Sequence, residues 1–170
     1  MSAFEKIGSD RQLQDHWLRR LVAGIVDGII TWVIAWVILS LVAIPALLLG
    51  GATWFGVFPL LSGVLFFAYA SFFESSRGAT IGMQIMNLKV TTTEGNAIGL
   101  NKSVLRNISK IHVLLWVIDT LIGMAMVGDP HQKYSDRFAG TTVKSTIEKD
   151  LFISTVVEAT TPPQAPPIST

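Results

Sequence analysis

Hydrophobic residues dominate one long section of the chain, and polar residues gather on both sides of it. No Asp, Glu, Lys, Arg or His occurs in the section 28–73. A bilayer core about 30 Å thick needs roughly 20 helical residues to cross it. The section therefore predicts two crossings, with a turn where Pro45, Gly50 and Gly51 interrupt the apolar run.

This pattern divides the chain into three parts. Residues 1–18 mix both signs of charge and predict a short amphipathic lead-in on the membrane surface. We expect a membrane domain over 19–147, with helices at about 19–41 and 54–73. The proline-rich end, 148–170, lacks a core-forming run and predicts a disordered tail.

The segment 74–102 differs from the apolar section before it. "IMNLKVTTT" is short and β-branched, "EGN" is a turn signal, and "AIGL" returns to apolar residues. This order favours a small β-hairpin or an ordered loop outside the membrane.

A shorter apolar stretch at 111–127 leaves the number of crossings open. It contains His112 and Asp119, so it fits either a third crossing or a helix that lies partly in the interface. We favour three crossings, because the stretch would otherwise expose a large apolar surface. The fold class expected is thus an all-α integral membrane protein of about three transmembrane helices, with a short β-hairpin-like cytoplasmic loop.

Composition narrows the possible functions. Half of the residues are hydrophobic and only 15% are charged, well below the roughly 25% of soluble domains. The net charge of +1 and the absence of cysteine argue against a nucleic-acid partner, a disulfide framework and a thiolate metal site. The chain also lacks the zinc, nucleophile-elbow and phosphate-loop motifs, so we expect no enzyme, no cofactor and no metal.

Lys and Arg residues near the helix ends predict the orientation. Four precede the first helix, none lies in the turn after it, and five occur in the segment 74–110. The N-terminus and this segment should both be cytoplasmic, which two crossings satisfy. The basic residues after 127 also favour the cytoplasmic side, which conflicts with a full third crossing.

The first helix carries a carboxylate where lipid would be expected. Arg20, Ala23, Gly24 and Asp27 have the spacing of one helix face. Gly24 and Gly28 form a GxxxG spacing, which lets a neighbouring backbone approach closely. We therefore expect Asp27 to face the protein interior.

Basic residues elsewhere are the expected partners of Asp27. The candidates are Arg106, Lys110 and Arg137, since charges inside a membrane usually pair. Two interpretations remain open: a structural ion pair that fixes helix register, or a transport or relay role. His112 and Asp119 share a narrow arc of the third segment and allow a proton relay as a further hypothesis, although packed or snorkelling side chains explain them equally well.

Three pieces of the chain together resemble the RDD family of small membrane proteins. They are "RRLVAGIVDGII", "RGATIGMQIMNLKVTTTEGNAIGLNKSVLRN" and "KYSDRFAGTTV", which span about 19–143. The arginine and two aspartates that give the family its name fall on Arg20, Asp27 and Asp136. One departure concerns the G-x-T-x-G-K loop of the family, where Met83, followed by Gln84, takes the place of the lysine.

The resemblance implies a multi-pass protein of a bacterial or archaeal cytoplasmic membrane. Transport, including cation/proton exchange, has been suggested for some members. It also sharpens the expected contacts: Asp136 would pair with Arg20, and Asp27 with Arg106. We therefore expect an ion or proton-coupled transporter or a transporter subunit, acting as a homo-oligomer or with a partner membrane protein. The alternative is a non-transporting accessory or scaffold protein whose charged residues are structural.

Overall fold

The computed structural model of the chain describes residues 2–47 and 54–147. The predicted turn at 48–53 and the predicted tail at 148–170 lie outside the described residues. The elements, in chain order, are α1 (Ala3–Ile7), α2 (Arg11–Leu47), α3 (Trp54–Arg77), α4 (Ile81–Ile85), β1 (Leu88–Thr92), α5 (Leu100–Asn107), the 3₁₀ helix η2 (Ile108–Ile111), α6 (Val113–Ala125), α7 (Tyr134–Phe138) and β2 (Thr141–Ser145).

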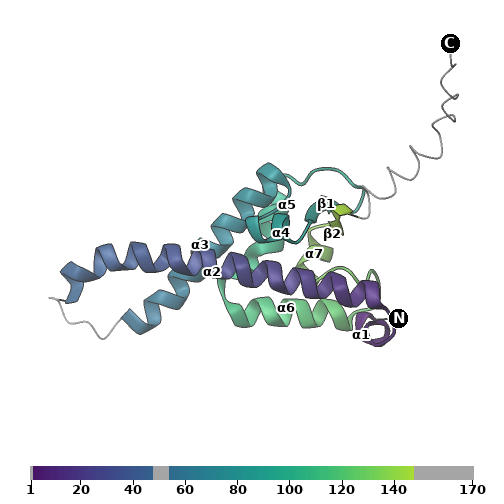
Figure 1. Cartoon of the computed structure of the whole chain (residues 1–170), viewed down its shortest axis with the longest axis horizontal. Coiled ribbons are helices and arrows are strands. Elements are labelled where there is room, and N and C mark those ends of the chain that lie inside the picture. The colour runs from purple at the N-terminus through teal and green to yellow at the C-terminus, as the bar shows by residue number, and fades with distance from the viewer. Residues whose placement is uncertain (1, 48–53, 148–170) are drawn as a thin grey trace, which may run out of the picture.

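Helices α2 and α3 are the two long apolar elements of the protein (Figure 1). Their sections Arg11–Leu41 and Phe58–Arg77 are long and apolar enough to cross a membrane. Helix α2 begins earlier than the predicted start at 19 because Asp10 caps it. The Asp10 carboxylate accepts hydrogen bonds from the backbone N–H groups of Gln12 and Leu13, which removes unpaired donors at the helix start.

The third predicted segment is divided by a sharp bend. Helices α5 and η2 meet α6 at an angle of 114° next to His112. Helix α6 has 13 residues and is about 20 Å long, shorter than a bilayer core. The described residues therefore contain two candidate spans, or three if the bent pair forms one span.

The predicted β-hairpin is wrong, although its first strand is present. Strand β1 pairs with the distant strand β2, antiparallel, with Val90 opposite Val143. The "EGN" turn does form, since the N–H of Thr92 donates to Asn96 O, but the residues after it enter α5 instead of a strand. Burial explains this choice. Val90 and Val143 are both nearly fully buried, so the pairing of β1 with β2 covers apolar side chains of both strands.

A small core joins the first half of α2 to this sheet. Its buried members are Ala23, Ala79, Met83, Leu88, Val90, Ile98 and Val143. Many large apolar side chains elsewhere on α2 and α6 are exposed, including Ile29, Trp32, Val113 and Leu114. So much exposed apolar surface is unusual for a soluble monomer and is expected of helices that face lipid.

Candidate functional site

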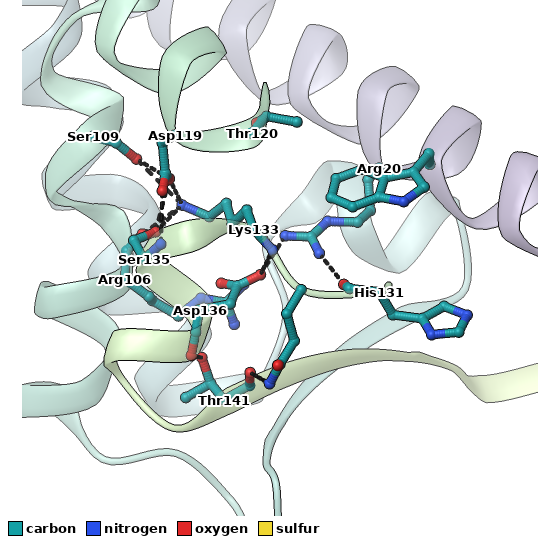
Figure 2. Close-up of polar contacts among 12 residues, drawn as sticks. Arg20, Arg106, Ser109, Asp119, Thr120, His131, Lys133, Ser135, Asp136 and Thr141 are labelled. Carbon is teal, nitrogen blue, oxygen red and sulfur yellow. Dashed lines mark hydrogen bonds and ion pairs between the residues drawn. The ribbon is translucent and has the colours of Figure 1, made fainter. Parts of the chain in front are cut away.

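The buried carboxylate of Asp136 connects α7 to two other helices. Its Oδ2 lies 2.7 Å from Nη2 of Arg20, on α2. Its Oδ1 lies 3.0 Å from Nη2 of Arg106, on α5. Both arginines and Asp136 are almost completely buried, and Figure 2 shows them converging from separate elements. The predicted pair between Asp136 and Arg20 is thus confirmed.

Arg106 extends these contacts to α3. Its Nε lies 3.4 Å from Oε2 of Glu74, whose Oε1 is 3.3 Å from Nζ of Lys110. Asn107 also donates a hydrogen bond of 2.7 Å to Glu74. We call the sequence Arg20–Asp136–Arg106–Glu74–Lys110 the charge chain. It alternates in sign along its length and ties together α2, α7, α5, α3 and η2.

A second ion pair, which we call the Lys133 pair, lies next to the charge chain. The Nζ of Lys133 is 2.6 Å from Oδ2 of Asp119 and donates to the backbone oxygen of Arg106 at 2.6 Å. Ser109 and Ser135 both donate to Asp119 through their hydroxyl groups (Figure 2). The pair therefore holds α6 against the loop before α7 and against the end of α5.

Burial and neighbouring charges shift the pKa values of this loop. Burial alone would raise the pKa of Asp136, but Arg106, Arg20 and Lys133 hold it below the usual aspartate range. Burial lowers the pKa of Lys133 to about 8, although Asp136 and Asp119 act in the opposite direction. Asp136 is therefore a fixed negative charge at neutral pH, whereas Lys133 can lose its proton in mild base.

Asp27 faces the protein interior as predicted, but its predicted partner is wrong. Its Oδ1 accepts hydrogen bonds from the Tyr69 hydroxyl at 2.8 Å and from the Gly82 N–H at 2.7 Å. Its Oδ2 accepts from the Thr80 hydroxyl. Arg106, the expected partner, is instead held by Glu74 and Asp136.

Among the described residues, no Lys or Arg forms an ion pair with Asp27. The reason is its position along α2: seven residues of helix place it about 10 Å beyond Arg20, at the level of the N-terminus of α4. There Thr80 caps α4, and the backbone N–H of Gly82 donates to the carboxylate. Gly82 allows this approach, because a Cβ there would collide with Ala23 O.

The GxxxG spacing of Gly24 and Gly28 on α2 was expected to let a neighbouring backbone approach closely, but the structure differs. Trp116 packs on Gly24, whereas a Cβ at Gly28 would meet nothing within 4 Å among the described residues. The close backbone approach on this face occurs between Ala23 and Gly82 instead.

The secondary site candidates have local roles in the structure. His112 caps α6, since its Nδ1 accepts from the Leu114 N–H at 3.2 Å. It forms no hydrogen bond with Asp119 in the described part of the chain, so the two residues of the relay hypothesis are not joined directly. Arg137 donates to the backbone oxygens of Gly123 and Val127, which closes the C-terminal end of α6.

Sequence reasoning missed two of the central residues. Glu74 is the first charge after the long apolar section, and Lys133 lies three residues before Asp136 at capping-box spacing. Both features are signals that the sequence contains. Two partners of Glu74, however, lie 33 and 36 residues away in the chain, so the sequence alone does not pair them with it. Gln84, which follows Met83 at the family's lysine position, donates to Ala79 O at 3.2 Å.

The three basic residues of the charge chain and Asp27 border a cavity of about 270 Å³ between α2 and α6. Arg20, Gly24 and Asp27 line it from α2, and Trp116 and Leu121 from α6. Within the ranges 2–47 and 54–147, no group of three or more His, Cys, Asp and Glu side chains is arranged to hold a metal ion.

The described residues form a mostly helical protein with two or three candidate membrane-spanning helices, a small two-stranded sheet and buried charges of alternating sign. The chain belongs to the RDD family, whose model matches residues 15–140. This range includes Arg20, Asp27 and Asp136, on which the motif resemblance rests. Comparison with curated proteins gave no match, and comparison with solved structures gave none either.

Proposed function

We propose that the protein is an ion transporter, or a subunit of one, in which Asp27 binds and releases a proton or a small cation. One observation carries the proposal: Asp27 is a buried carboxylate held by neutral donors, on the wall of a cavity. An ionisable group inside a membrane segment is costly and often marks an ion pathway.

The neutral surroundings suit a group that changes its charge. A carboxylate between guanidinium groups stays ionised, because protonation would leave those cations unpaired. Asp27 has no such constraint from Tyr69 or Thr80, whose hydroxyl groups can reverse their hydrogen bonds when the carboxylate is protonated. Carboxylate and hydroxyl oxygens are also ligands suited to small hard cations.

The remaining parts of the proposal concern assembly and location. Two or three membrane helices do not enclose a pathway alone, so we propose a homo-oligomer or a complex with a partner membrane protein. We propose a multi-pass arrangement in the cytoplasmic membrane, with the N-terminus cytoplasmic. The proposal assigns no catalytic reaction to the protein.

Proton flux into liposomes tests this function directly. The full chain is reconstituted with a pH-sensitive dye inside the vesicles, and a cation gradient is applied. Asp27→Asn should abolish cation-dependent proton flux while circular dichroism shows an unchanged helix content. Asp15→Asn is the matched control, because Asp15 is an exposed acid on the same helix, and it should retain full flux.

The charge chain favours a second candidate, an accessory or scaffold protein. Its acids and bases form ion pairs with one another within the described fold, as expected of structural charges. Absence of flux under every cation and pH gradient, together with a membrane partner that co-purifies, would support this candidate and contradict transport. Flux that persists in Asp27→Asn would contradict the role given to Asp27.

A further inference from the structure

The cavity between α2 and α6 is lined mainly by apolar surface, and basic residues contribute to its lining. Its apolar walls come from Trp17, Leu21, Met83, Trp116, Val117, Leu121 and Met124. Four basic residues line it as well: Arg20, Arg106, Lys110 and Lys133. The volume of about 270 Å³ lies just below the roughly 300–1,000 Å³ of small-molecule sites.

The charges are arranged unevenly around this space. Asp27 is the one acid that lines the cavity. The acids that pair with the four bases, Asp136, Glu74 and Asp119, lie outside the lining. Four bases and one acid therefore line the cavity, and this surplus of positive side chains favours an anion.

Arg106 gives an independent indication of a missing partner. Its side chain is 1% exposed and lines the cavity. Its Nη1 atom is buried and has no hydrogen-bond partner among the described residues. A buried guanidinium N–H without an acceptor costs free energy, and an anionic oxygen in the cavity would supply that acceptor.

We propose that this cavity binds the headgroup of an anionic membrane phospholipid. The phosphate would lie among Arg20, Arg106 and Lys110, and the first part of an acyl chain would follow the apolar walls. Leu21 and Leu121 are both about half exposed, so the cavity reaches the outer surface of the helices, where the rest of the lipid would lie. The proposal does not depend on transport.

The position of the cavity along α2 supports a lipid as the occupant. Trp17 and Arg20 lie near the charged end of the candidate span Arg11–Leu41. Aromatic and basic side chains settle at the level of the headgroups, and basic pockets between membrane helices bind anionic headgroups. A free phosphate ion would satisfy the bases but leave the apolar walls uncovered.

Lipid retention by the purified full-length protein tests the proposal. The protein is incubated with phosphatidylglycerol or phosphatidylcholine in neutral detergent, and bound lipid is counted by native mass spectrometry. The wild-type chain should retain phosphatidylglycerol preferentially. Thr120→Trp fills the cavity, because Thr120 lines it and its hydroxyl contacts only the oxygen of Trp116 on its own helix. This variant should lose most of the retained lipid.

Two further variants separate shape from charge. Ile118→Trp places the same side chain on α6 at an exposed position outside the cavity lining, and it should retain lipid like the wild type. Lys110→Gln should reduce the preference for phosphatidylglycerol about fivefold, because each basic residue near an anionic lipid contributes about 1 kcal/mol. Glu74 keeps Arg106 and Asn107 as partners in this variant.

Three results would overturn the proposal. The first is equal retention of the two lipids by the wild-type chain. The second is unchanged retention by a folded Thr120→Trp variant. The third is complete displacement of phosphatidylglycerol by millimolar inorganic phosphate, which would identify a small-anion site instead of a lipid site. Because no ion gradient is applied, these results are independent of any flux measurement.

Discussion

Asp27, on α2, and Asp136, which pairs with Arg20 of the same helix, are two buried carboxylates that differ in the charge of their partners. Asp136 lies between the guanidinium groups of Arg20 and Arg106. Asp27 is held by two hydroxyl groups and one backbone N–H. The first arrangement fixes a negative charge, whereas the second surrounds the carboxylate with neutral donors.

The family motif of Arg20, Asp27 and Asp136 should therefore contain residues with two different roles. Arg20 and Asp136 connect elements that are far apart in the chain, and their removal should act on folding. Asp27 has neutral partners, so its isosteric replacement leaves no cation unpaired. Stability and ion movement should therefore respond to different members of the motif.

The largest expected effect comes from Asp136→Asn, which leaves two buried arginines without their shared carboxylate. We expect it to lower the free energy of unfolding by about 3–5 kcal/mol. Asp27→Asn should cost about 1–3 kcal/mol, since one of its neutral donors loses an acceptor. The measurement is unfolding by increasing dodecyl sulfate in detergent micelles, followed by circular dichroism.

A double-mutant cycle sharpens this prediction. Arg20→Gln should cost less than Asp136→Asn, because Arg106 still pairs with Asp136. The two changes together should deviate from additivity by about 0.5–3 kcal/mol, and full additivity would contradict the pairing. Asp15→Asn serves as the control, since its exposed pair with Arg19 is worth no more than about 1 kcal/mol.

A smaller effect is expected from crowding the Asp27 site without changing any charge. Gly82→Ala places a Cβ 2.9 Å from Cγ of Asp27 and against Ala23 O. We expect a loss of about 1–3 kcal/mol, as is typical of overpacking, in the same unfolding assay. Gly28→Ala is the matched control on α2, because its Cβ meets none of the described residues within 4 Å. Equal stability of the two variants would contradict the close approach of α4 to α2.

The last effect is a slope with pH and concerns the pH dependence that Lys133 confers. Its pKa is lowered from 10.5 to about 8 in the folded protein, so between these values the unfolded chain binds more protons. Stability should therefore rise with pH across this window, by no more than about 1.4 kcal/mol per pH unit.

Unfolding measured from pH 7 to 10 tests this slope. Lys133→Gln should remove the Lys133 part of the slope, because the replacement does not titrate. Lys102→Gln, which changes an exposed lysine, should keep it. Identical slopes in the wild-type chain and Lys133→Gln would show that Lys133 has an ordinary pKa in the folded protein.

Much of the architecture was predictable from local patterns. The uninterrupted apolar section indicated the long helices, and the spacing of Arg20, Ala23 and Asp27 indicated a face buried in protein. Both inferences depend only on helix periodicity and on the cost of charge in lipid. The family resemblance added the contact between Arg20 and Asp136, which lie 116 residues apart.

Contacts between distant elements were not predictable in the same way. The strand β1 was recognisable, but its partner β2 was not, because pairing is decided by which apolar faces can be covered together. Arg106 was the wrong partner for Asp27, since several bases satisfy the same charge rule and only the distances between packed helices select among them.

The sequence by itself determined that α2 carries a buried acid, because the spacing of residues along one helix defines which of them share a face. Only the tertiary structure decided that the partners of this acid are neutral. One of its donors is the backbone N–H of Gly82, and nearly every residue has such a group. Its importance comes from the place where α4 begins, which depends on packing against α2 and not on the identity of the residue alone.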